Sequence, residues 1–359
     1  NALVKREVFS GVDPQRILWT NSGTAALALA LRSAAEGCGR PGGEVLLPAY
    51  TCPDVLSACL WAGLKPRLLD LAADTPWMDL AAVEAAAGSD TAAIVAINFM
   101  GIRERLPALS ALADGVGAVL VEDSAQYFPE TAAALSADFT VVSFGKGKPV
   151  STLGGGALLV KGCGQKLPVL PVPRRTSLVP ILQRLVYNAV IAPQIYGGLV
   201  RLPGLGIGAT RYQPLLEVSG MDDMRCAWLA GNVEYWCHRE QPAVSQLSAG
   251  ILLLRDQGVI DLARLCPGTR LLRYPLLLPD ESVTARAEQR LLAAGLGASR
   301  LYRRILPELT GVPGESLVCQ GELPVARAFA SRLLTLPVHS GVRARDVYAM
   351  LHIIRDGLH

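Results

Sequence analysis

The sequence has little of what marks several common classes of protein. Aromatic residues make up 6% of its 359 residues, and its four histidines lie far apart in the chain. The net charge of +3 includes no strong block of either sign, so the composition does not indicate nucleic-acid binding. No apolar run approaches the roughly 20 residues of a membrane-spanning helix. A chain of this length is instead expected to bury a substantial core, divided between two lobes.

The eight cysteines are scattered, without a Cys-x-x-Cys pair or a neighbouring histidine cluster. This pattern is typical of reduced thiols packed as small apolar side chains in a cytoplasmic protein, and it predicts no metal site. The first residues contain no apolar core followed by a small-residue cleavage site, so no secretory signal is predicted. Because the chain starts without methionine, a removed leader stays open.

Residues 15–160 alternate between short apolar runs and helical patterns. The runs are apolar on both faces, as in a parallel sheet covered by helices on each side. We predict strands at 44–48, 65–71, 91–99, 117–123 and 138–144, a further strand after Gly154–Gly156, and helices at 79–87, at 106–114 and from Pro53. The predicted fold class is therefore α/β, with a mostly parallel sheet sandwiched by helices. Such sheets bind ligands beyond the carboxyl ends of their strands.

The chain changes character after residue 162. Residues 163–220 are rich in proline, glycine and apolar residues and have no clear periodicity, as in an insertion with a functional role. A long helix is predicted from Asp222 to about Arg239, followed by helices mixed with strands such as 270–278. We predict a large domain over residues 1–220 and a smaller C-terminal α+β domain over residues 221–359.

Lys148 lies in a glycine-rich loop, and a carboxylate and several small polar residues precede it in the chain. Pyridoxal 5′-phosphate needs a lysine amine for its aldehyde, a carboxylate beside its pyridine nitrogen, and N–H groups and hydroxyls around its phosphate. Asp123 ends a predicted strand and offers the carboxylate. The predicted phosphate ligands are the N–H groups of Gly23, Thr24 and Ala25 and the hydroxyl of Ser143. The sequence therefore predicts a pyridoxal-phosphate enzyme with Lys148 as its catalytic amine.

Each of these features also has an ordinary structural explanation. A Ser-Gly-Thr before a helix is usually an N-cap, and an aspartate after a strand is usually a turn or cap residue. A lysine in a glycine-rich loop, such as Lys146, is usually solvated. The loop is no phosphate-binding P-loop, because Pro149 follows Lys148 where serine or threonine is required. What favours the cofactor is the ordered set, with fixed spacings from Asp123 to Gln126 and from Ser143 to Lys148.

The segments that carry these residues resemble the DegT/DnrJ/EryC1/StrS family of fold-type I pyridoxal-phosphate enzymes, the sugar aminotransferases. The resemblance rests on residues 20–27, 43–51, 62–66, 121–126, 142–148 and 336–339. It implies that Lys148 forms the Schiff base with the cofactor, that Asp123 pairs with the pyridine nitrogen and that Gln126 contacts the ring. It also implies that Thr24, Ala25 and Ser143 hold the phosphate.

The resemblance implies an aminotransferase that forms a homodimer with active sites at the subunit interface. An amino acid, glutamate by family analogy, would donate the amino group. A nucleotide-linked ketosugar would accept it, in polysaccharide or secondary-metabolite biosynthesis, with Lys148 as general acid–base in both half-reactions. Two alternatives stay open. One is a lyase or another pyridoxal-phosphate chemistry, although the sugar dehydratases of the family replace the lysine by histidine. The other is a catalytically degenerate scaffold protein.

The sequence departs from the family pattern in three places. Cys52 stands where family members usually carry an aromatic residue that stacks on the cofactor ring, so Cys52 is expected to contact the ring with less surface. Around residues 218–221 there is no counterpart of the asparagine that the family supplies to the partner's phosphate. Only about twenty residues precede Ser22, where the family has an additional helix and strand. The surroundings of Lys148 are thus not the usual ones.

Residues 174–201 contain apolar side chains at helical spacing, flanked by arginines. A helix of this kind either packs on the protein's own core or subunit interface, or lies on an anionic membrane surface. We therefore keep peripheral membrane contact through residues 174–201, or a hydrophobic substrate, as a hypothesis. His339 near the C-terminus either lines the cleft or is an ordinary core or surface histidine.

Overall fold

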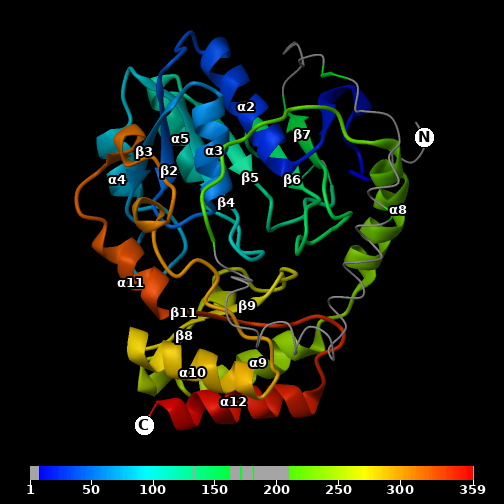
Figure 1. Ribbon diagram of the computed structural model, residues 1–359, viewed down its shortest axis with the longest axis vertical. Helices are drawn as coiled ribbons and strands as arrows, with labels where there is room; N and C mark the ends of the chain where they lie inside the picture. Colours follow the sequence, from blue (N-terminus) through cyan, green and yellow to red (C-terminus); the bar gives the residue numbers. More distant parts are fainter. Residues whose placement is uncertain are drawn as a thin grey trace.

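The computed structural model describes residues 8–131, 133, 135–161, 170–171, 181 and 210–358. The helix proposed to contact a membrane, within residues 174–201, lies outside the described residues except for Ile181. Figure 1 shows a central sheet covered by helices, with further helices beneath it. Within the described part of the chain, no helix combines the length and the apolarity needed to cross a membrane.

The central sheet has eight strands in the order β1-β7-β6-β5-β4-β2-β3-β10. Neighbouring strands from β6 to β10 run parallel, whereas β7 is antiparallel to both β6 and β1. The strands are β1 (Ile17–Thr20), β2 (Glu44–Pro48), β3 (Lys65–Leu69), β4 (Thr91–Ile97), β5 (Val119–Asp123), β6 (Phe139–Ser143), β7 (Gly156–Val160) and β10 (Val318–Cys319). The mostly parallel sheet predicted from the sequence is confirmed.

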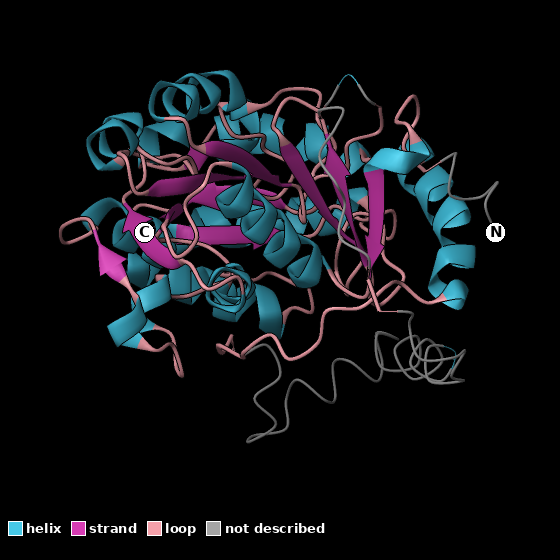
Figure 2. Cartoon of the chain, turned by 90° about the horizontal axis from the view of Figure 1, so that it is seen from above, coloured by secondary structure: helices cyan, strands magenta, loops and turns pink. Residues whose placement is uncertain are grey.

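Helices cover both faces of the sheet, as the view from above shows (Figure 2). The helices are α2 (Gly23–Gly37) and α3 (Pro53–Trp61) on one face, and α4 (Leu80–Ala86) and α5 (Leu106–Val116) on the other. Successive residues of a strand point to opposite faces, so Val45 and Leu47 of β2 pack in the core beneath α2 and α3. Leu46 packs in the core beneath α4 and α5. The continuous apolar runs thus serve two separate cores.

One predicted boundary shifts for a clear reason. The strand expected at 117–123 begins at Val119, and the helix expected at 106–114 continues to Val116. Gly117 ends α5 in the left-handed conformation, with φ of 65°. Glycine adopts this conformation without steric cost and is therefore a helix C-cap rather than the first strand residue.

Residues 223–358, which we call the C-terminal segment, combine helices with a three-stranded antiparallel sheet of order β11-β9-β8. The strands are β8 (Ile260–Asp261), β9 (Tyr274–Leu277) and β11 (Leu333–Leu336), and the helices are α8 (Asp223–His238), α9 (Pro242–Leu252), α10 (Glu281–Ala293), α11 (Pro324–Arg332) and α12 (Ala344–Gly357). Among the described residues, the 3₁₀ helices are η1 (Pro14–Arg16), η3 (Arg255–Gln257), η4 (Leu262–Leu265), η5 (Leu306–Glu308) and η6 (Gly314–Ser316). Helix α8 runs beside the central sheet and leads to α9, α10 and α12 at the far end (Figure 1).

Hydrogen bonds anchor the C-terminal segment on the central sheet. Asp70, which follows β3, accepts the backbone N–H groups of Val325 (3.0 Å) and Ala326 (2.7 Å) in the first turn of α11. The N-cap residue of α11 makes no side-chain cap bond, so Asp70 performs that task from the other part of the chain. The N–H of Leu306 donates to the carbonyl of Ala49 after β2 (2.9 Å). These bonds hold the C-terminal segment at the carboxyl ends of β2 and β3.

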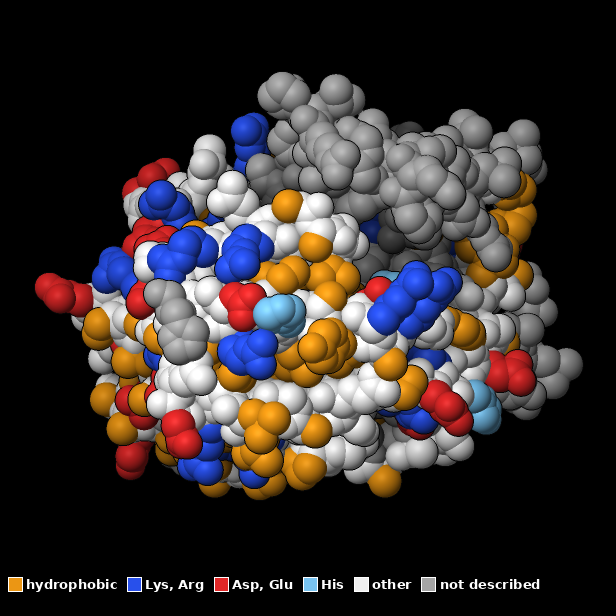
Figure 3. Space-filling view, turned by 90° about the horizontal axis from the view of Figure 1, so that it is seen from below, with side chains coloured by type: hydrophobic (Ala, Val, Ile, Leu, Met, Phe, Trp, Pro, Cys, Tyr) orange, Lys and Arg blue, Asp and Glu red, His pale blue; other side chains and the backbone are white. Residues whose placement is uncertain are grey.

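The face seen from below mixes charged side chains with small apolar areas (Figure 3). The large apolar side chains that α9, α10 and α12 expose include Leu252, Leu292 and Tyr348. Single apolar side chains among charges are ordinary on a protein surface and do not mark a docking site.

Candidate active site

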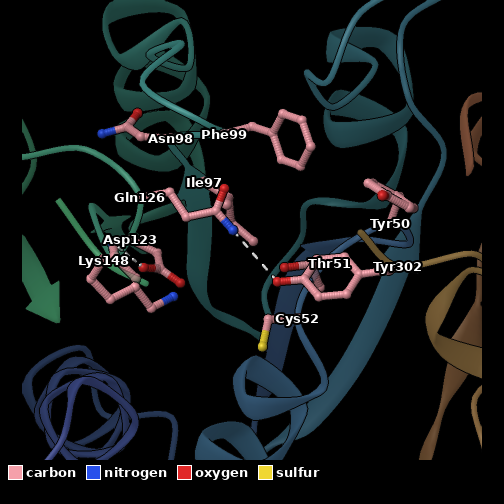
Figure 4. A pocket seen from close by; sticks show the side chains of 11 residues that line it. Tyr50, Thr51, Cys52, Ile97, Asn98, Phe99, Asp123, Gln126, Lys148 and Tyr302 are labelled. Carbon is pink, nitrogen blue, oxygen red and sulfur yellow. Dashed lines mark hydrogen bonds between the residues drawn. The ribbon is translucent and has the colours of Figure 1, made fainter. Parts of the chain in front are cut away.

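Two adjoining cavities lie at the carboxyl ends of β2, β4, β5 and β6. Both are lined by Cys52, Asp123, Ala125 and Lys148. The first, which we call the tyrosine cavity, is completed by Tyr50, Thr51, Ile97, Asn98, Phe99, Gln126 and Tyr302 (Figure 4). The second, the cradle cavity, is completed by Gly23, Thr24, Leu27, Asp54, Val55 and Ser143. The site thus lies where parallel sheets of this kind bind ligands.

The cradle cavity is formed by the first turn of α2 and the end of β6. Ser22 is the N-cap of α2, and its Oγ accepts the N–H of Ala25 (3.0 Å). A Cβ atom at Gly23 would lie 2.5 Å from the Cβ and 2.8 Å from the Oγ of Ser143, so only glycine allows this approach. The positive end of a helix, the Thr24 side chain and the Ser143 hydroxyl therefore meet at one place. This combination suits a phosphate group.

The loop between β6 and β7 presents Lys148 to both cavities. Gly147 has φ of 68°, which closes a tight turn before the lysine. The Ser151 hydroxyl donates to the carbonyl of Gly145 (2.9 Å), and the Asn232 amide of α8 donates to the carbonyl of Ser151 (3.0 Å). The loop is therefore tied to itself and to α8, which fixes the position of the lysine backbone.

Asp123 ends β5 with its carboxylate between the two cavities. It is 7% exposed, and its Oδ1 accepts the N–H of Ala125 (2.9 Å). Burial raises the pKa of the Asp123 carboxyl, while the Ala125 hydrogen bond and the nearby Lys148 amine act in the opposite direction. A carboxyl of this kind is stabilised in its ionised form by a cationic partner such as a protonated pyridine nitrogen.

A buried polar network supports β5 beside Asp123. Glu122 is fully buried and accepts the Asn98 amide (2.7 Å) and the Thr140 hydroxyl (3.1 Å). Arg103 completes the network with an ion pair to Glu122 (3.3 Å). Because the buried charge has both hydrogen-bond donors and an ionic partner, the network is stable and rigid. It fixes the strand end from which the Asp123 side chain projects.

Tyr302 belongs to the site although no sequence pattern singled it out. It comes from the C-terminal segment, and its hydroxyl accepts the Gln126 amide N–H at 3.5 Å (Figure 4). The Cys52 thiol lines the same cavity, and burial raises the pKa of both groups, that of Cys52 to about 11. The Oε1 of Gln126 accepts the N–H of Met100 (2.9 Å), so the amide nitrogen is the end that faces Tyr302. Only the tertiary fold brings these residues together.

The structure gathers most of the predicted site residues. Seven of them line one or both cavities, namely Gly23, Thr24, Cys52, Asp123, Gln126, Ser143 and Lys148. Ala25 lines neither, and its N–H is already engaged by Ser22. His339 also lines neither, and its Nδ1 accepts the N–H of Gly341 (3.2 Å). Lys146 is exposed. Lys148 is thus the lysine that shares these cavities with Asp123.

The residues that line the two cavities fit pyridoxal phosphate. The contact of Gly23 with Ser143 is too close for any side chain and lies at a helix start, where N–H groups bind anions. The buried Asp123 carboxyl has the Lys148 amine near it, and both residues line both cavities. The three requirements of the cofactor are met within one continuous site.

The family model for the DegT/DnrJ/EryC1/StrS aminotransferases matches residues 9–162. A UDP-N-acetyl-3-dehydro-α-D-glucosamine 3-aminotransferase from Acidithiobacillus ferrooxidans is 37% identical over 105 residues, which are 29% of this chain and 28% of that protein. The matched part thus spans well under half of this relative. A dTDP-3-amino-3,4,6-trideoxy-α-D-glucose transaminase from Streptomyces venezuelae is 25% identical over 94% of this chain and 81% of its own length.

Solved structures extend the likeness to the whole fold. A putative sugar aminotransferase from Streptococcus pneumoniae, in its pyridoxal-phosphate form, matches with a TM-score of 0.74 and 21% identity, covering 99% of this chain and 90% of its own. This shows the fold. The family match covers the strands and loops that carry Gly23, Asp123 and Lys148. Over residues 9–162, the chain is similar to the DegT/DnrJ/EryC1/StrS aminotransferase family.

Proposed function

We propose that the protein is a pyridoxal-phosphate-dependent aminotransferase. It moves an amino group from an amino acid, glutamate in our proposal, to the keto group of a sugar-nucleotide-like substrate. One observation carries this proposal: the Lys148 amine and the Asp123 carboxyl share two joined cavities with the cradle of Gly23, Thr24 and Ser143. The sugar class is taken from the named activities of the two relatives, which act on sugar nucleotides.

When bound, pyridoxal phosphate supplies an aldehyde that takes up the amino group and a protonated ring that draws electrons from the substrate carbon. Lys148 holds the aldehyde carbon and then, as general acid–base, moves the proton at the substrate carbon. Asp123 keeps the pyridine nitrogen protonated through its negative charge. Thr24 and Ser143 bind the phosphate together with the N–H groups of the α2 terminus.

Gln126 is proposed to contact the cofactor ring from the tyrosine cavity. The N–H of Met100 holds its Oε1, which leaves the amide N–H₂ as a donor towards the cavity. Met100 itself has φ of 56°, and its carbonyl accepts the N–H of Leu272 in the C-terminal segment (2.9 Å). The orientation of Gln126 therefore depends on contacts between the two parts of the chain.

Absorption spectroscopy tests the proposal. The purified protein supplied with pyridoxal phosphate should develop a visible band that Lys148→Ala abolishes and that glutamate bleaches. The matched control is Lys146→Ala, because Lys146 is an exposed lysine in the same loop and should leave the band unchanged. Ketosugar nucleotides should then restore the band as they accept the amino group.

Each other outcome would support a different function or a different catalytic amine. If no band forms in the wild-type protein, it does not bind the cofactor covalently, and a scaffold protein is the better description. If the band forms but no amino donor bleaches it, a lyase replaces the aminotransferase. An unchanged band in Lys148→Ala would show that another amine holds the cofactor.

We also propose a homodimer in the cytoplasm, divided into a large domain (residues 1–220) and a smaller one (residues 221–359). The long helix α8 at the proposed boundary supports this division, because it leads from the side of the central sheet to the C-terminal helices (Figure 1). Analytical ultracentrifugation tests the dimer. Peripheral membrane contact through residues 174–201 remains a prediction, which liposome co-sedimentation at low salt would refute by showing no bound protein.

A further inference from the structure

The residues that line both cavities together with Asp123 and Lys148 have small side chains. A cofactor ring that reaches both residues must lie where the two cavities meet, and the other residues shared by both cavities are Cys52 and Ala125. A thiol and a methyl group offer little flat surface to an aromatic ring. An aromatic partner, if there is one, must come from another residue of the site.

Three aromatic side chains line the tyrosine cavity, and two of them are already packed elsewhere. Tyr50 and Phe99 both meet the ring of Phe329 in α11 edge to face, with ring centroids 5.0 and 5.9 Å apart. Tyr50 and Phe99 also contact each other at 5.9 Å. These two rings are held by the core between the central sheet and the C-terminal segment.

Tyr302 is placed differently. Its hydroxyl accepts the Gln126 amide N–H at 3.5 Å, while its ring rests against Tyr50 with centroids 5.6 Å apart. Figure 4 shows the ring beside Thr51, with the hydroxyl pointing into the cavity that Asp123 and Lys148 line. Tyr302 is thus tied by its hydroxyl to Gln126, the residue proposed to contact the cofactor ring.

We propose that Tyr302, brought in by the C-terminal segment, is the aromatic wall of the cofactor-ring site and makes up for the small side chain of Cys52. The inference rests on the proposed function, since it concerns the site of pyridoxal phosphate. The ring supplies surface, and the hydrogen bond from Gln126 to its hydroxyl keeps the ring in place. The cofactor site is then complete only when the C-terminal segment is docked.

The position of Tyr302 depends on that docking. Leu306, four residues further on, donates its N–H to the carbonyl of Ala49 (2.9 Å), next to Tyr50. The backbone on either side of Tyr302 is also held by Arg300, which is 5% exposed and donates to the carbonyl of Ser331 (3.0 Å). The tyrosine therefore sits on a fixed backbone, as a wall residue should.

Cofactor affinity of the purified protein tests the proposal. Titrations with pyridoxal phosphate, followed by absorbance and by visible circular dichroism, would compare wild type with Tyr302→Leu and Tyr302→Phe. Tyr302→Leu removes the ring and should raise the dissociation constant about tenfold, whereas Tyr302→Phe keeps the ring and should change it less than about threefold. Tyr348→Leu, at an exposed tyrosine of α12, is the matched control and should leave the affinity unchanged.

A second variant distinguishes the loss of the aromatic contact from a general disturbance of the fold. Cys52→Phe places an aromatic ring at another lining position of the same cavity, so Cys52→Phe combined with Tyr302→Leu should recover the affinity to within about threefold of wild type. Thermal unfolding without cofactor reports whether each variant folds. Recovery in the double variant with unchanged unfolding temperature would support the proposal.

The failures can be told apart. A wild-type protein that does not bind pyridoxal phosphate would overturn the proposed function and this inference with it. A wild type that binds, with Tyr302→Leu binding equally well, would overturn this inference alone. A loss of cofactor affinity in Tyr302→Phe as large as in Tyr302→Leu would show that the hydroxyl and not the ring matters. It would refute the proposal that the Tyr302 ring contacts the cofactor.

Discussion

Replacing Asp123 by asparagine should make the cofactor-free protein more stable and should lower its affinity for the cofactor. The carboxyl is 7% exposed, and burial raises its pKa above the ordinary value. Asparagine has nearly the same shape, and its Oδ1 can still accept the N–H of Ala125 (2.9 Å in wild type). The substitution therefore removes a charge from a buried place without removing the local hydrogen bond.

The pH dependence follows from the direction of the shift. In the folded protein Asp123 binds its proton more tightly than in the unfolded chain, so stability falls as pH rises from the unfolded pKa of about 3.9 to the folded pKa. Above the folded pKa the loss is complete, and each pKa unit between the two states corresponds to about 1.4 kcal/mol. Asparagine does not titrate. The stability gain of Asp123→Asn should thus be absent below about pH 4 and largest at neutral pH.

Cofactor affinity should move in the opposite direction. A hydrogen bond to a charged group contributes about 1.5–3 kcal/mol, so losing the charge beside the pyridine nitrogen should weaken binding about 10- to 100-fold. The assays are urea unfolding of the cofactor-free protein from pH 4 to 8 and titration with pyridoxal phosphate. Asp114→Asn, at an exposed position of α5, is the control. A variant with unchanged stability at pH 7 and unchanged affinity would refute the role given to Asp123.

Substitutions at three further positions test the structure that supports the site. Gly23→Ala places a Cβ atom 2.5 Å from that of Ser143. The substitution should lower the free energy of unfolding by about 1–3 kcal/mol, measured by calorimetry. It should also weaken phosphate binding, measured by competition with inorganic phosphate. Gly37→Ala at the other end of α2 has open space around it and should instead stabilise by up to about 1 kcal/mol. Asp70→Ala removes the acceptor of two N–H groups of α11 and should cost about 2 kcal/mol in urea unfolding, with a smaller loss in Asp70→Asn, which keeps one acceptor oxygen.

The sequence predicted the central sheet well because its signal is local. The strand at 44–48 is observed at Glu44–Pro48, and the helix predicted from Asp222 is observed at Asp223–His238. Apolar runs that end at glycine, proline or aspartate mark such elements without knowledge of the fold. Asp123 and Ser143 could be assigned to strand ends for the same reason, and parallel pairing then brings those ends to one edge.

The sequence could not predict what depends on the docking of distant parts. Tyr302 and Cys52 are 250 positions apart, and nothing around Tyr302 marks it as a site residue. The capping of α11 by Asp70 is equally hidden, since helix caps are expected within two or three residues of the helix start. Ala25 shows the reverse case: its place in a phosphate motif suggested a free N–H, but the neighbouring Ser22 hydroxyl takes it.

The two halves of the site therefore differ in how they are built. The cradle, the lysine loop and Asp123 all lie within the 9–162 segment that matches the family, on elements joined by short connections. The tyrosine cavity is also lined by Tyr302 from the C-terminal segment. Two more of its lining residues, Tyr50 and Phe99, pack against Phe329 of α11. Loosening the C-terminal segment, as in Asp70→Ala, should then weaken the hold on the ring more than the hold on the phosphate. Affinities for pyridoxal phosphate and inorganic phosphate, measured on the same variant, would separate the two effects, and an equal loss of both would contradict this division of the site.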